Sequence, residues 1–272
     1  MPILRPSLRD ARTRRIAAIR RTLIIGAVAA GTALSLAAVT GGLPVPVLSA
    51  APIPSSSAVA PQANPRTRYA DFGQASPSPE ARHIADWIAD SRDNENADFI
   101  IVDKRDATAY VFDAEARLRG ASPVLLGAAL GDESVPGIGL RPIAEVRPEE
   151  RTTPAGRFVA ERGRNLKGED VVWVDYEAAV SMHRVRTTKP SERRLERLAT
   201  PTVDDNRISY GCINVPVAFY EAYVRPTVAT RRAIVYVLPD IKPVQQVFNA
   251  YDVTAVRKQA SNRTTGDTLS TR

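Results

Sequence analysis

Seven short runs of apolar and β-branched residues, separated by polar and turn-forming residues, dominate the middle of this chain. Runs of this length and composition are typical of β-strands. They are residues 99–103, 108–112, 124–127, 153–159, 171–176, 178–182 and 233–238. Helical signals are confined to 80–91, 191–199 and 216–224. We therefore expect a mainly β fold, a sandwich or barrel with a few short helices.

The positive charge of the chain is concentrated at its start. The net charge is +7 over 272 residues, but residues 1–21 hold seven arginines and one acid, and so carry +6 of it. The rest of the chain is nearly neutral. Because the excess is not spread over a folded surface, nucleic-acid binding loses its main support, and we expect no nucleic-acid partner.

An uncharged, alanine-rich stretch, residues 22–41, follows these arginines. A basic segment before an apolar one is typical of a signal peptide or a membrane anchor. Arg20 and Arg21 also resemble a twin-arginine export signal. We expect export to the periplasm or cell-wall side. Membrane contact is then limited to residues 22–41, and only if that segment is not cleaved.

The remaining chain divides by composition. Residues 42–79 are rich in proline, alanine and serine, which is typical of a linker. Residues 80–97 contain a helix capped by Ser78, and residues 98–239 contain the predicted strands. Residues 240–272 are predicted to be a C-terminal tail that is partly disordered.

Cys212 is the only cysteine, and His183 and His83 are the only histidines. A lone thiol cannot form an intramolecular disulfide and is easily oxidised outside the cell, so its presence favours a function. A thiol and an upstream histidine predict a nucleophile and its base. The alternatives are that Cys212 is a small buried residue and that His183 is a structural residue at a strand end. His83, on the first predicted helix, is expected to be structural.

Other catalytic signatures are missing from the sequence. It contains no Cys/His cluster with zinc spacing, no glycine-rich phosphate loop and no Gly-x-Ser-x-Gly motif. We therefore expect no metal and no organic cofactor.

Two motifs follow one another in an order that resembles a known family. Residues 209–214 read Ser-Tyr-Gly-Cys-Ile-Asn and follow a predicted strand that ends at His183, while residues 153–158 read Thr-Pro-Ala-Gly-Arg-Phe. The two opening strands also fit. Over roughly residues 98–239 the chain resembles the L,D-transpeptidase catalytic (YkuD-like) domain. The resemblance implies a β-sandwich domain that acts on peptidoglycan stem peptides.

The resemblance also implies roles for individual residues. Cys212 would attack the stem-peptide bond before the terminal D-alanine, and His183 would take the proton. Backbone N–H groups around Gly211 would face the oxyanion, and Ser209 would orient His183. Asn214 would bind the stem peptide or brace the loop. The thioester would pass to an amine in transpeptidation. The alternatives are an L,D-carboxypeptidase, which uses water, and a non-catalytic peptidoglycan-binding module.

The chain departs from the family pattern at three points. Arg184 stands where the family commonly has glycine, and Tyr210 where it often has a second histidine; both are expected on the substrate side. The spacing from His183 to Cys212 is also longer than usual. We interpret the extra residues within 184–208 as a helical flap over the cleft. Its basic residues are Lys189, Arg193, Arg194 and Arg197.

Overall fold

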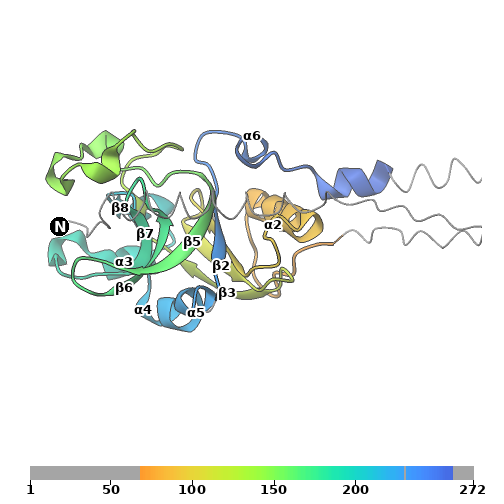
Figure 1. Ribbon diagram of the computed structural model, residues 1–272, viewed down its shortest axis with the longest axis horizontal. Helices are drawn as coiled ribbons and strands as arrows, with labels where there is room; N and C mark the ends of the chain where they lie inside the picture. Colours follow the sequence, from red (N-terminus) through yellow and green to blue (C-terminus); the bar gives the residue numbers. More distant parts are fainter. Residues whose placement is uncertain (1–67, 230, 260–272) are drawn as a thin grey trace, which may run out of the picture. The chain divides into compact units, whose positions relative to one another are not determined.

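The computed structural model describes residues 68–229 and 231–259 (Figure 1). The predicted segments 1–21 and 22–41, and most of the 42–79 linker, lie outside these residues. Within the part that is described, no helix is both long and apolar enough to span a bilayer.

Most strands of the domain belong to one mixed sheet. The strands are β1 Phe99–Asp103, β2 Thr108–Phe112, β3 Leu118–Pro123, β4 Leu126–Gly127, β5 Gly156–Arg164, β6 Asp170–Asp175, β7 Val180–Arg184, β8 Arg207–Ser209, β9 Ile213–Val215 and β10 Ala233–Val237. The eight-stranded sheet has the order β3-β2-β1-β10-β5-β6-β7-β9, and β4 and β8 form a small parallel pair. β1 pairs with β10, and β7 with β9, in parallel, while the other neighbours are antiparallel.

The sheet curves nearly into a barrel. Residues 118–127 begin in β3 at one edge, and Leu125 then bridges Asn214 in β9 at the other edge. Both backbone hydrogen bonds of this bridge are 2.8 Å long. The prediction of a mainly β fold with a few short helices is confirmed. Of the two expected architectures, the structure takes the barrel-like one rather than the β-sandwich that the resemblance implies, because residues 124–127 connect the two edges of the eight-stranded sheet.

The helices are short. They are α2 Pro79–Ser91, α3 Arg194–Ala199, α4 Val217–Phe219, α5 Arg225–Thr227 and α6 Val244–Phe248, with single 3₁₀ turns at Ile138–Leu140, Ile143–Glu145, Pro148–Glu150, Pro190–Glu192 and Val203–Asn206 and a π-helical segment at Tyr220–Val224. The predicted start of α2 is confirmed: the Ser78 Oγ accepts a hydrogen bond of 3.0 Å from the Ala81 N–H, and Pro79 takes the first helical position. The helix ends at Arg92 in a left-handed conformation.

Two apolar cores lie on opposite faces of the sheet. In β1, Ile100 and Val102 face one core, which the helical segment 217–228 covers. Phe99 and Ile101 face the other core, which α2 and α6 cover (Figure 1). The strand is therefore buried on both faces, which explains why it reads as a continuous apolar run rather than an alternating one.

Several predicted elements are altered in the structure. The strand expected at 153–159 runs from Gly156 to Arg164, and the one expected at 124–127 is reduced to Leu126–Gly127. The helix expected at 191–199 begins only at Arg194, because Arg193 adopts a left-handed conformation with φ of 48°. The helix expected at 216–224 runs from Val217 to Thr227 and includes a π-helical segment. The strand expected at 178–182 is shifted to Val180–Arg184, since residues 176–179 form the turn after β6.

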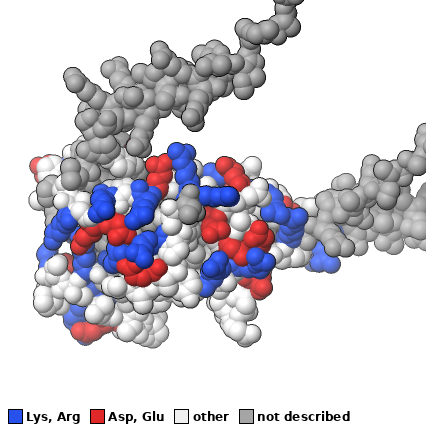
Figure 2. All heavy atoms as spheres, turned by 60° about the horizontal axis from the view of Figure 1, so that its bottom comes forward, with Lys and Arg blue, Asp and Glu red and all other residues white. Residues whose placement is uncertain are grey.

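The domain extends beyond the range of its predicted strands. Ala70 and Phe72, within the expected linker range, are buried, and the Phe72 ring packs edge-on against Tyr110 and Phe112. At the other end, Phe248 of α6 packs on the same core. On the face that Figure 2 shows, acidic and basic side chains are interspersed rather than gathered by sign.

Candidate active site

Cys212 lies on a tight loop between β8 and β9. Gly211, which precedes it, has φ of +117°, a conformation that residues with a side chain rarely adopt. A Cβ at Gly211 would also lie 2.6 Å from the carbonyl oxygen of Thr152. Both observations require glycine before the cysteine, and they show that the loop is packed directly on residues 152–153.

Two hydroxyl groups hold the backbone of this loop. The Ser209 Oγ donates to the Cys212 carbonyl at 2.6 Å and accepts from the Gly211 N–H at 3.0 Å. The Thr153 Oγ1 donates to the Gly211 carbonyl at 2.9 Å and accepts from the Gly127 N–H at 2.9 Å. Ser209 therefore braces the loop, whereas we expected it to orient the histidine. The Gly211 N–H is used within the loop rather than directed at an oxyanion.

His183 reaches the loop through strand pairing. It lies in β7, and the parallel register of β7 with β9 places it opposite Asn214. Its Nδ1 lies 2.8 Å from the carbonyl oxygen of Arg184. Since a carbonyl can only accept, Nδ1 carries a proton, and Nε2 is left as the basic nitrogen.

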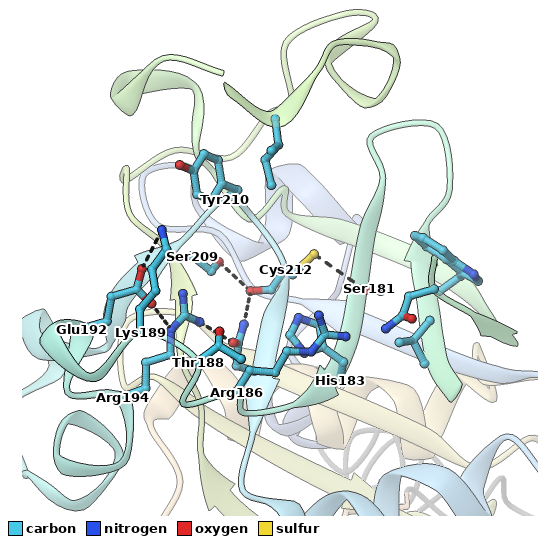
Figure 3. Close-up of a pocket in the computed structure, with 15 residues that line it drawn as sticks. Ser181, His183, Arg186, Thr188, Lys189, Glu192, Arg194, Ser209, Tyr210 and Cys212 are labelled. Carbon is cyan, nitrogen blue, oxygen red and sulfur yellow. Dashed lines mark hydrogen bonds and ion pairs between the residues drawn. The ribbon is translucent and has the colours of Figure 1, made fainter. Parts of the chain in front are cut away.

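The environment of Cys212 favours the thiolate. Burial raises the pKa of the thiol, but the influence of the His183 ring and of Ser181 together lowers the pKa below its ordinary value. The Ser181 Oγ lies 3.7 Å from the Cys212 Sγ (Figure 3). Ser181 and His183, both in β7, thus lie beside the loop that carries Cys212.

Asn214 is a bracing residue in this structure. It is buried, with 1% of its surface exposed, and its Nδ2 donates to the Cys212 carbonyl at 3.1 Å. Its Oδ1 accepts from Arg194 at 2.6 Å. Of the two roles expected for Asn214, the bracing of the loop is the one that these contacts make.

A cavity of about 300 Å³ opens over the thiol (Figure 3). Its lining comprises Ile143, Asn165, Val171, Trp173, Ser181, His183, Arg186, Thr188, Lys189, Glu192, Arg194, Ser209, Tyr210, Cys212 and Asn214. Tyr210 is partly exposed at its rim, and the Arg151 guanidinium lies 4.1 Å from the centre of its ring. The lining holds three cations and one carboxylate and is net positive, although Arg186 pairs with Glu169 and both Lys189 and Arg194 pair with Glu192.

Arg184 does not belong to this cavity, although we expected it on the substrate side. Its guanidinium donates to Glu221 at 2.6 Å and pairs with Asp170 at 3.1 Å. It also lies 4.2 Å from the ring centre of Tyr220. Side chains alternate across a strand, so Arg184 points away from the face that carries His183.

The predicted flap contributes some of its basic residues to the cavity. Lys189 and Arg194 line it. Arg193 instead pairs with Glu196 outside it, and Arg197 donates to backbone carbonyls. The flap is therefore a 3₁₀ turn followed by the short helix α3 rather than one continuous helix.

A buried ion cluster lies behind the loop. Lys104, fully buried, pairs with Asp132 and Asp240 at 3.1 Å each. Its Nζ also donates to the Thr153 carbonyl at 2.8 Å. Arg207, the first residue of β8, pairs with Asp240 at 2.6 Å. The cluster thus supports both the 152–153 turn and the strand that leads to Cys212.

Ser181 was not identified as a site residue from the sequence, and Thr153 was identified only as part of the 153–158 motif. The alternation of a strand could have identified Ser181, because it lies two residues before His183 and so on the same face. No comparable signal marks Thr153 as a partner of Gly211. Among the described residues, no group of three or more His, Cys, Asp or Glu side chains is placed to hold a metal ion.

Comparison with known proteins gives matches among solved structures only. No family model matches the chain, and no curated protein matches it. Its structural neighbours are L,D-transpeptidase catalytic domains. They include an L,D-transpeptidase from Mycobacterium tuberculosis H37Rv, with 15% identity, a TM-score of 0.33 and coverage of 52% of this chain and 57% of that chain.

The catalytic domain of the Enterococcus faecium L,D-transpeptidase is another neighbour, with 16% identity, a TM-score of 0.27 and coverage of 53% of this chain and 98% of that domain. The helical cell shape determining protein Pgp2 from Campylobacter jejuni matches with 14% identity, a TM-score of 0.36 and coverage of 57% and 55%. Similarity this low says nothing by itself about activity. The activity of this chain must therefore be inferred from the geometry of its site.

Proposed function

We propose that this protein is an exported cysteine acyltransferase of peptidoglycan, an L,D-transpeptidase. The observation that carries the proposal is the Cys212 thiol. Its pKa is lowered by His183, and it lies at a cavity of about 300 Å³ with a cationic lining. A thiolate near neutral pH is the form that attacks carbonyl groups, and stem peptides carry the carboxylates that such a lining attracts.

The first half-reaction forms a thioester. The Cys212 sulfur attacks the carbonyl carbon that links the third stem residue to the terminal D-alanine. A C–S bond forms and the C–N bond breaks, and the proton held by His183 passes to the leaving amine of D-alanine. The His183 Nδ1–H remains bonded to the Arg184 carbonyl throughout, so Nε2 is the atom that exchanges the proton.

The second half-reaction releases the enzyme. An amine from a neighbouring stem attacks the thioester carbon, a C–N bond forms, and the C–S bond breaks. The amine proton passes to His183, and Cys212 returns to its thiolate form. With water in place of the amine, the same steps give a carboxypeptidase.

The test uses the purified full-length chain with tetrapeptide muropeptides, read by mass spectrometry beside Cys212→Ala. Transpeptidation predicts loss of D-alanine together with dimers, both absent in the variant. Loss of D-alanine without dimers would replace the transpeptidase by a carboxypeptidase. No difference between the wild-type chain and Cys212→Ala would refute both enzymes and leave a peptidoglycan-binding module.

A further inference from the structure

The flap makes a side-chain contact with Asn214 in β9, two residues after Cys212. Arg194, the first residue of α3, donates from Nη1 to the Asn214 Oδ1 at 2.6 Å. Its Nε donates to Glu192 at 2.6 Å. The Arg194 side chain is 14% exposed, whereas that of its neighbour Arg193 is 69% exposed. Arg194 is thus turned into the site, and Arg193 is turned to solvent.

The contact decides which way the Asn214 amide faces. A guanidinium has only donors, so the amide must present its oxygen to Arg194. The amide nitrogen is then directed at the Cys212 carbonyl, to which it donates at 3.1 Å. Without Arg194 the buried oxygen of the Asn214 amide loses its donor, and the amide is no longer held from both ends. Its hydrogen bond to the Cys212 carbonyl then weakens, which leaves Ser209 as the other donor to that carbonyl.

The backbone of Cys212 determines where its sulfur lies. Its carbonyl is held by the side chains of Asn214 and Ser209, while the backbone of His183 is held by the pairing of β7 with β9. The lowered pKa of the thiol depends on contacts with His183 and Ser181. A small movement of the Cys212 backbone therefore weakens those contacts without moving the histidine.

We propose that Arg194 is a positioning residue for Cys212. It acts through Asn214, whose amide it orients, and so makes the reactivity of the thiol depend on docking of the flap. The proposal deepens the proposed function, because Cys212 is the nucleophile in both. It concerns the thiol itself, however, and can be tested without a peptidoglycan substrate.

The test is the pH dependence of alkylation by iodoacetamide in the full-length chain. Cys212 is the only cysteine, so alkylation reports on it alone. Arg194→Met is expected to raise the apparent pKa of the thiol, so that the midpoint of the alkylation profile moves up by about one pH unit. The matched control is Arg193→Met, adjacent and exposed, whose midpoint should stay within about 0.3 pH unit of wild type. Equal effects of the two variants would overturn the proposal.

Two further variants separate positioning from charge. Arg194→Lys keeps the positive charge but lacks the fork that reaches Glu192 and Asn214 together, so the pKa should stay raised. A wild-type pKa of the thiol in Arg194→Lys would mean that the positive charge alone is responsible, and would overturn the proposal. Asn214→Ala should match Arg194→Met, and the double variant should be no slower than either single one. Additive effects would show that Arg194 does not act through Asn214.

If Arg194→Met does not fold, the alkylation profile of Arg194→Lys tests the proposal in its place. Failure of the muropeptide assay with the alkylation results as predicted would refute the transpeptidase and leave the positioning role standing. If instead the muropeptide assay gives the predicted products and the alkylation results do not follow the prediction, only the role of Arg194 is refuted.

Discussion

The hydroxyl of Thr153 offers the sharpest test of how the nucleophile loop is held. Thr153 is fully buried, and its Oγ1 joins the Gly127 N–H to the Gly211 carbonyl at 2.9 Å each. Thr153→Val replaces the hydroxyl by a methyl group of similar shape. Packing is preserved, while a buried donor and a buried acceptor both lose their partner.

The expected cost follows from those two groups. An unsatisfied buried polar group costs about 1–3 kcal/mol, so Thr153→Val should lower the free energy of unfolding by about 2–6 kcal/mol. Thr153→Ser keeps the hydroxyl and loses one methyl group, which costs about 1 kcal/mol. Urea denaturation of both variants measures the difference.

A second readout connects stability to the site. Because the Gly211 carbonyl precedes Cys212 in the loop, Thr153→Val should also slow alkylation of the thiol at neutral pH, and Thr153→Ser should not. If Thr153→Val lowers the free energy of unfolding no more than Thr153→Ser does, the bridging hydroxyl does not stabilise the loop and the reasoning fails.

Three other substitutions test separate parts of the site. His183→Ala should raise the pKa of the Cys212 thiol, so the pH profile of iodoacetamide alkylation should move to higher pH; an unmoved profile would exclude the histidine as the cause. Lys104→Met leaves two buried aspartates without their shared cation and should cost about 3–5 kcal/mol in urea denaturation, whereas a cost under about 1 kcal/mol would contradict the burial of the cluster. Gly211→Ala should lower the free energy of unfolding more than Gly168→Ala does. Both glycines have positive φ, but of the two only Gly211 has a backbone oxygen where a Cβ would lie. Equal losses of stability in the two variants would show that this close contact does not matter.

The pKa of Cys212 also predicts how stability varies with pH. The thiol pKa is lower in the folded chain than in the unfolded one. The resulting stabilisation is therefore fully present above the unfolded pKa, and it is lost as the pH falls through the folded pKa. Cys212→Ser should remove this alkaline gain in the free energy of unfolding, and an unchanged pH profile would contradict the lowered pKa.

Part of this protein can be derived from the chain alone. The runs of β-branched residues predict most central strands, because a strand buried on both faces needs a continuous apolar run, as β1 shows. The cap at Ser78 predicts the start of α2 through a purely local hydrogen bond. A single thiol, with glycine before it and one histidine upstream, identifies Cys212 and His183 as the candidates for chemistry.

The remaining features depend on contacts between distant segments. The strands β8 and β9 have three residues each, too few to show a pattern, and they form because β4 and β7 supply their partners. The near-closure of the sheet rests on Leu125 meeting Asn214, far apart in the sequence.

The same distinction applies to the site. Residue type and spacing pointed to Cys212 and His183, but only the parallel pairing of β7 with β9 brings the loop of Cys212 beside the strand of His183. Arg184 was expected at the substrate and faces Asp170 and Glu221 instead, since the pleat of the strand sends neighbouring side chains to opposite faces. The chain by itself determined which groups can react. The tertiary structure decided which groups hold them, because those hydrogen bonds join residues that no local pattern relates.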